Sequence, residues 1–336
     1  IDAAINRCIE GVRVVEDYVR FVLDDRHLTE RLKSWRHDFA AAAGRFAADH
    51  RLAFRDTPGD VGTAVTLPSE QKRGSIDAVL AANFSRTAEA LRSLEEWSKV
   101  LLPDVSSAFE ALRYRSYSLQ QAVCNTRRAI RRLAGARLYV LIDAGKSEDD
   151  LRRMVRAVRD GGADIIQLRE KRLDDRELYR RGCIVREELP PGGPLFIMND
   201  RPDLAVAVEA DGVHVGQEEL PPREARKIIG ADRLLGVSTH DIDQARRAVL
   251  DGADYIGVGP TFPSSTKQFT EFPGLAFVGR VAREIRLPAF AIGGISLDNI
   301  DQVLNAGLGR VAVSGAVTNT DDPETAVRLL KAALLE

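Results

Sequence analysis

The sequence predicts a (β/α)8 TIM barrel of the α/β class, preceded by an all-α helical bundle. After Arg137, eight short apolar, β-branched segments each precede a stretch with helical periodicity. Their apolar runs are nearly continuous, as in parallel strands that are buried on both faces. The segments DGGADIIQL, EADGVHVG and DGADYIGVG are also similar to one another, and each leads from the end of a predicted helix into a predicted strand. The predicted strands span residues 137–143, 163–171, 194–200, 211–217, 233–240, 253–260, 287–295 and 310–316.

The first 133 residues lack convincing strands. Apolar positions with a helical period predict four helices, at residues 5–22, 28–46, 76–101 and 106–133, with a loop at 54–74. A chain of 336 residues is long enough for a bundle domain at 1–133 and a barrel domain at 134–336. Charged residues are dense on the helices, as at Arg13 and Glu89. They form either a pocket for a charged ligand or interhelical salt bridges, and both interpretations stay open.

Composition excludes several classes of partner. The chain has 48 basic and 50 acidic residues and a net charge of −2, so we expect neither nucleic acid nor an anionic membrane as a partner. No apolar run approaches the roughly 18 residues of a spanning helix, and we expect a cytoplasmic protein. Cys8, Cys124 and Cys183 are odd in number and widely spaced, which favours free thiols. The chain begins with Ile inside a helical pattern, so we expect the natural start to lie upstream. The oligomeric state is not predicted.

The end of the second predicted strand carries hydrogen-bonding and cationic side chains. Strand alternation sends Gln167, Arg169 and Lys171 to one side, where they would line the mouth of the barrel. Polar groups that face inward in a parallel barrel are costly without a ligand. This set suits a polyanion.

Carboxylates follow the third and fourth strands. Asp200 and Glu219 fall at neighbouring strand ends, where their oxygens could share one hard cation. Mg²⁺ commonly takes one or two protein carboxylates and completes its shell with water and phosphate oxygens. The alternative for Asp200 is an N-cap on the following helix. A metal here would clamp a diphosphate against the cations of the second strand.

The later strands predict a second anion site. Residues 259–267 form a candidate lid that supplies hydroxyl, amide and Lys donors, and Ser238 adds another donor. His240 is interpreted as a structural neighbour. Gly293-Gly294 and Ser314-Gly315 form a phosphate cradle of the kind that barrels build from their last two loops. Two anion sites on one rim predict that two phosphorylated substrates are joined.

Seven motifs in this order carry a resemblance: QLREK, MNDRPDLA, DGVHVGQE, GVSTH, GPTFPSSTK, AIGGI and VAVSGAV. From about Arg137 to the end, the chain resembles the thiamine-phosphate synthase family. The resemblance implies a transferase that joins hydroxymethylpyrimidine diphosphate to a thiazole phosphate, with Mg²⁺ and release of diphosphate. It implies catalytic roles for Lys171, Lys267 and Ser238, and metal ligation by Asp200 and Glu219. The implied substrate-binding residues are Gln167, Arg169, Lys171, Asn199, Ser238, Ser264, Thr266, Lys267, Gly294, Val313 and Ser314.

Two positions depart from the family pattern. The family usually has Asp where Glu219 stands and Thr where Ser264 stands. Glu is one methylene longer, so Glu219 reaches the metal either directly or through water. The implied reaction is dissociative, with charge stabilised on the departing diphosphate and no strong general base.

The front domain also resembles a known module. NRCIEGVRVVEDYVRFVLDD, LTERLKSWRHD, RDTPGDVGT, LRSLEEWSKV and ALRYRSYSLQQA resemble a helical module that is fused ahead of some thiamine-phosphate synthases. That module is a proposed alternative hydroxymethylpyrimidine-phosphate kinase. Two alternatives remain for the barrel: a thiazole tautomerase-like relative, which needs no diphosphate site, and a non-catalytic sensor that binds thiazole phosphate. Retention of Lys171, Asp200 and Lys267 argues against the tautomerase.

Overall fold

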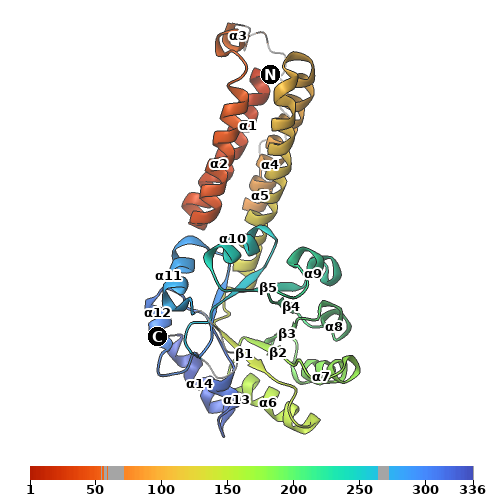
Figure 1. Cartoon of the computed structure of the whole chain (residues 1–336), viewed down its shortest axis with the longest axis vertical. Helices are drawn as coiled ribbons and strands as arrows, with labels where there is room; N and C mark the ends of the chain where they lie inside the picture. The colour runs from red at the N-terminus through yellow and green to blue at the C-terminus, as the bar shows by residue number, and fades with distance from the viewer. Residues whose placement is uncertain (54, 57–58, 60–71, 264–271, 336) are drawn as a thin grey trace. The chain divides into compact units, whose positions relative to one another are not determined.

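The computed structural model describes residues 1–53, 55–56, 59, 72–263 and 272–335 (Figure 1). The chain forms two compact units, Ile1–Cys124 and Asn125–Glu336. The first is helical and the second is a closed eight-stranded barrel, as the sequence predicted. No helix in the described ranges is long and apolar enough to cross a membrane. Cys8, Cys124 and Cys183 all lie in the described ranges and form no disulfide there.

The first unit contains the four predicted helices. They are α1 (Asp2–Asp17), α2 (Arg26–Ala43), α4 (Ile76–Leu101) and the first part of α5 (Ser106–Arg132). A π-helical turn, η1 (Tyr18–Leu23), extends α1, and a 3₁₀ turn, η4 (Pro103–Val105), precedes α5. The short α3 (Ala48–Ala53) was not predicted. Most of the predicted loop at 54–74 lies outside the described residues.

The helices of this unit pack around a core of aromatic side chains. The rings of Trp35 and Phe39 stack at 5.6 Å, and Phe39 meets Phe109 edge-on at 6.1 Å. Trp35 Nε1 donates to the carbonyl of Leu112 at 2.9 Å, which satisfies its polar end inside the core. At Gly11 a Cβ would lie 2.6 Å from Thr87 Oγ1, so a glycine is needed where α1 packs against Thr87 of α4.

The second unit is a barrel of eight parallel strands that pair in chain order, with β1 closing on β8. All eight predicted strands are confirmed. The strands are β1 (Leu138–Ile142), β2 (Ile165–Leu168), β3 (Leu195–Asn199), β4 (Gly212–Val215), β5 (Leu234–Thr239), β6 (Tyr255–Val258), β7 (Ala289–Ile292) and β8 (Val311–Val313). Helices surround them (Figure 1): α6 (Glu148–Asp160), α7 (Asp175–Glu188), α8 (Pro202–Ala207), α9 (Pro222–Ile229), α10 (Ile242–Leu250), α11 (Gly274–Glu284), α12 (Ile300–Asn305), α13 (Gly315–Thr318) and α14 (Pro323–Ala333).

An aspartate in the repeated motif explains part of the strand register. Asp164, Asp211 and Asp254 precede β2, β4 and β6. Each carboxylate accepts a backbone N–H from the preceding strand: Asp164 from Leu138 at 2.9 Å, Asp211 from Phe196 at 2.8 Å, and Asp254 from Leu235 at 2.9 Å. The repeat therefore ties neighbouring strands together at the end of the barrel opposite the predicted rim.

The barrel unit includes the last turns of α5. Asn125 Nδ2 donates to the carbonyl of Gly252 at 2.9 Å, and Arg128 pairs with buried Asp254 at 3.2 Å. Leu133 is fully buried in the barrel core beside inward residues such as Ile165. Residues 125–133 thus contribute hydrogen bonds and apolar contacts to the barrel.

Candidate active site

The predicted polar residues gather where the barrel strands end. Parallel strands bring their carboxyl ends to one rim, so side chains after β2, β3, β4 and β5 face a common mouth. Three predicted residues, Ser264, Thr266 and Lys267, lie outside the described residues.

Gln167 and Asn199 point into the barrel and are buried. Gln167 is 2% exposed, and its Nε2 donates to Tyr139 Oη at 2.7 Å. Asn199 is 7% exposed, yet within the described structure its Nδ2 has no hydrogen-bond partner. A buried donor without a partner is costly, so a ligand that accepts from Asn199 would stabilise the site.

Lys171 brings together both predicted metal ligands. Its Nζ lies 2.9 Å from Asp200 Oδ2 and 3.2 Å from Glu219 Oε1. The hydrogen bond to Asp200 is the main reason that the pKa of Lys171 is raised. Burial is the largest single influence on Glu219 and opposes its ionisation. The hydrogen bond and charge of Lys171, together with nearby backbone N–H groups, nevertheless hold the pKa of Glu219 below its ordinary value. Arg169 is half-buried just beyond β2.

The backbone fixes both carboxylates. Asp200 has a left-handed conformation with φ of 61°, and its N–H donates to the carbonyl of His214 at 2.8 Å. It does not cap α8, whose N-cap is Arg201 without a side-chain bond, so the N-cap alternative is wrong. Glu219 folds back over Gly216, where a Cβ would lie 2.2 Å from Glu219 Oε2.

The carboxylate pair is compatible with a metal cofactor. Asp200 and Glu219 both reach one ammonium and would reach one cation in its place. No group of three or more His, Cys, Asp or Glu that could hold a metal occurs in the described ranges. Two carboxylate ligands suit a hard ion that keeps waters and binds substrate oxygens.

A chain of buried and half-buried polar groups below the rim was not predicted. Tyr139 Oη and Tyr255 Oη lie 3.0 Å apart, and Tyr255 Oη lies 3.3 Å from His214 Nδ1. His214 Nε2 lies 2.9 Å from Ser238 Oγ. Burial lowers the pKa of His214 to about 4 and raises the pKa of both tyrosines, so these groups are neutral near pH 7. His240 Nδ1 lies 2.7 Å from the carbonyl oxygen of Gly259, a contact that favours its structural interpretation.

The loops after β7 and β8 present small residues. Gly293 and Gly294 have φ of 101° and 63°. A Cβ on Gly294 would lie 2.5 Å from the carbonyl of Pro263, so this turn requires glycine. Asn299 Nδ2 supports the turn by donating to the carbonyl of Gly294 at 2.9 Å. Val313 ends β8 and Ser314 precedes α13.

In the helical unit, several of the predicted charges form ion pairs. Buried Glu16 accepts from Arg36 at 2.9 Å and lies 3.8 Å from Arg13. Buried Glu95 pairs with Arg113 at 2.9 Å. These contacts favour the salt-bridge interpretation for these residues.

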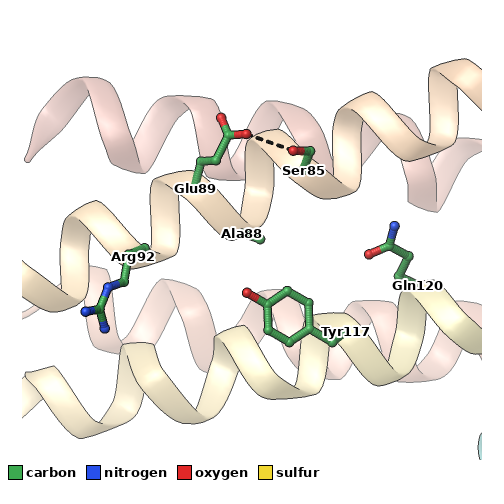
Figure 2. Close-up of a pocket in the computed structure, with 6 residues that line it drawn as sticks. All are labelled: Ser85, Ala88, Glu89, Arg92, Tyr117 and Gln120. Atoms are coloured by element: carbon green, nitrogen blue, oxygen red, sulfur yellow. Dashed lines mark hydrogen bonds between the residues drawn. The ribbon is translucent and has the colours of Figure 1, made fainter.

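One pocket in the helical unit nevertheless includes Glu89, one of the charged residues noted in the sequence. A cavity of about 370 Å³ lies between α4 and α5. Figure 2 shows Tyr117 and Gln120 reaching from α5 toward α4, where Ser85 Oγ donates to Glu89 Oε1 at 2.7 Å. The lining residues are Ser85, Ala88, Glu89, Arg92, Tyr117 and Gln120.

Comparison with known proteins matches both units. Residues 138–317 match the family model described as thiamine monophosphate synthase, and residues 1–122 match the ThiD2 family. A thiamine-phosphate synthase of Rhodopirellula baltica is 46% identical over 96% of this chain and 88% of its own length. One from Thermosynechococcus vestitus is 40% identical over 98% of this chain and 93% of its own. The solved thiamine phosphate pyrophosphorylase from Pyrococcus furiosus is 33% identical, with a TM-score of 0.54, over 59% of this chain and 95% of that one.

Proposed function

The chain belongs to the thiamine-phosphate synthase family of transferases in thiamine biosynthesis, and we propose that its barrel rim joins hydroxymethylpyrimidine diphosphate to thiazole phosphate. The observation that carries this proposal is the cluster of Lys171, Asp200 and Glu219, which follows Asn199, whose Nδ2 has no hydrogen-bond partner among the described residues. A diphosphate and its cation would occupy such a cluster.

The first substrate would bind at the ends of β2 and β3. Gln167 and Asn199 supply buried amide groups that can hydrogen-bond a pyrimidine, and Arg169 and Lys171 place positive charge at the mouth for the diphosphate. Lys267, which follows β6 in the sequence, would add a third cation.

Asp200 and Glu219 would hold Mg²⁺. When bound, this ion stabilises negative charge on diphosphate oxygens. Lys171 now contacts both carboxylates, and with a metal between them its ammonium would turn to the diphosphate. The positive charge that these residues supply or hold would favour departure of the leaving group.

The second substrate would bind at the last loops. The turn at Gly294 and the chain at Val313 and Ser314 offer backbone N–H groups without bulky side chains, as a phosphate cradle needs. Ser264 and Thr266 would add hydroxyl donors.

The reaction we propose begins with cleavage of the bond between the pyrimidine methylene carbon and the diphosphate oxygen. The diphosphate takes the bonding electrons, where Lys171, Lys267 and Ser238 stabilise them. The thiazole nitrogen then donates its lone pair to the methylene carbon, so no strong general base is needed. Holding both reactants on one rim supplies much of the remaining rate advantage.

Diphosphate release tests this function. Full-length protein with both substrates and Mg²⁺ should release one diphosphate for each thiazole phosphate consumed, and omission of either substrate or of Mg²⁺ should stop it. Isomerised thiazole phosphate without diphosphate would support the tautomerase alternative. Binding of thiazole phosphate without turnover would support the sensor.

For the helical unit we propose phosphorylation of hydroxymethylpyrimidine phosphate to the diphosphate. The ThiD2 match over residues 1–122 and the pocket at Glu89 and Tyr117 support a ligand-binding role. Protein given the pyrimidine monophosphate, ATP and thiazole phosphate should make thiamine phosphate only if it makes the diphosphate itself. Glu89→Gln should weaken this coupled reaction and leave the reaction from supplied diphosphate unchanged. No product from the monophosphate, with the barrel active, would refute the kinase.

A further inference from the structure

Five polar side chains form a continuous hydrogen-bonded chain across the barrel interior. The bonds join Gln167 Nε2 to Tyr139 Oη at 2.7 Å, Tyr139 to Tyr255 at 3.0 Å, Tyr255 to His214 Nδ1 at 3.3 Å, and His214 Nε2 to Ser238 Oγ at 2.9 Å. The residues come from β2, β1, β6, β4 and β5, so the chain connects opposite walls of the rim. Polar groups that are shielded from water in such an arrangement must serve as hydrogen-bond donors and acceptors for one another.

Counting the available protons determines which atom donates in each bond of the hydrogen-bonded chain. The amide of Gln167 can only donate through Nε2, so Tyr139 Oη accepts there. In the described part of the chain, the remaining partner for the Tyr139 proton is Tyr255 Oη. Tyr255 must then donate its own proton to His214 Nδ1. A neutral imidazole with a lone pair on Nδ1 carries its proton on Nε2.

The last bond determines the role of Ser238. His214 Nε2–H donates to Ser238 Oγ, so the serine oxygen is already occupied by a donor. Its own proton is therefore free to point away from His214, toward the mouth of the barrel where Ser238 is half-buried. A serine with this polarity is a donor to an anion.

We propose that Tyr139, Tyr255 and His214 are positioning residues that orient the Ser238 hydroxyl as a hydrogen-bond donor to the leaving diphosphate. The proposal rests on the proposed function, because it assigns the chain to the step in which charge builds on that group. In this proposal the direction of every bond is set by the N–H that Gln167 donates to Tyr139. Gln167, proposed to bind the pyrimidine, is thereby linked to Ser238, proposed to bind the diphosphate.

Gly236 provides the space for the central bond. A Cβ at this position would lie 2.4 Å from both Tyr255 Oη and His214 Nδ1. Gly236→Ala would therefore separate these two groups without removing any hydrogen-bonding atom. A Cβ at Gly257 would lie 3.5 Å from His214 Cε1, an ordinary van der Waals contact, so Gly257→Ala is the matched control for an added methyl.

The functional test compares two backgrounds. Ser238→Ala should lower kcat by about 10- to 100-fold, the effect of one bond to a charged group. Gly236→Ala should lower kcat in the otherwise unchanged protein, while Gly257→Ala should not. In the Ser238→Ala background, Gly236→Ala should have no further effect. Equal losses in both backgrounds would overturn the proposal, and a harmless Ser238→Ala would overturn the role proposed for Ser238 itself.

The direction of the chain has its own readout, which does not depend on turnover. Nitrogen-15 NMR of the histidine-labelled full chain, with the His214 signals assigned by their loss in His214→Gln, should show a proton on Nε2 and a lone pair on Nδ1. Tyr255→Phe, which removes one hydroxyl, should change the Nδ1 signal and serves if Gly236→Ala fails to fold. A proton on Nδ1 in the unaltered protein would overturn the proposed direction.

Discussion

Replacing Lys171 with Met should have opposite effects on metal affinity and on turnover. In the structure the Lys171 ammonium contacts Asp200 at 2.9 Å and Glu219 at 3.2 Å, so a cation that enters between the carboxylates must displace it. Lys171 is half exposed, and each such pair contributes about 0.5–1 kcal/mol. Loss of both pairs should therefore tighten Mg²⁺ binding in the absence of substrate by about 5- to 30-fold.

Turnover should move the other way. Lys171 is proposed to contact the diphosphate when the metal is bound, so its loss should lower kcat by about 10- to 100-fold. Calorimetric titration with Mg²⁺ gives the affinity, and diphosphate release gives kcat. Arg172→Met is the control, because it removes the same charge from the next residue, which is 85% exposed and pairs with Glu170. Unchanged or weaker Mg²⁺ binding by Lys171→Met would refute this account of the site.

Three further outcomes are expected. Asp200→Asn keeps a side chain that tolerates the left-handed backbone but loses the charge, so kcat/KM measured with Mg²⁺ should fall by more than about tenfold. A fragment of residues 134–336 lacks Leu133 and the hydrogen bonds of Asn125, which should lower its free energy of unfolding by about 3 kcal/mol relative to a fragment of residues 125–336. Its melting temperature should therefore be roughly 6–12 °C lower. The hydrogen bond from Arg156 is the main cause that lowers the pKa of Glu188 to about 2. The lowered pKa stabilises the fold above pH 4.5, and this stabilisation is lost as the pH falls toward 2 and Glu188 becomes protonated. Glu188→Gln should thus lower the melting temperature at pH 7, and the difference should shrink in acid.

The sequence predicted the barrel well because its signals are local. Alternation alone placed Gln167 inside the barrel, and the apolar runs located each strand. The sequence also predicted which residues lie at the rim, because polar residues directly follow the strands, as Asp200 follows β3.

The contacts between strands could not be predicted in the same way. That Lys171 would meet both Asp200 and Glu219 depends on side-chain directions in three separate loops. His214 was recognised only as part of a strand, because its partners Tyr255 and Ser238 are distant in sequence. A usable signal existed, since alternation turns these polar side chains inward and buried polar groups need partners.

The left-handed backbone at Asp200 limits which amino acids this position can accept. With φ of 61°, β-branched and bulky residues are strained, and only Gly, Asn and Asp adopt such a conformation readily. Of these three, Asp alone carries a negative charge. A library of all substitutions at position 200 should therefore divide into two tiers: many variants that fold poorly, and Asn and Gly variants that fold normally but turn over slowly. The shape of the main chain and the demand for a charged ligand select the same residue, so neither constraint can be relaxed by evolution without the other.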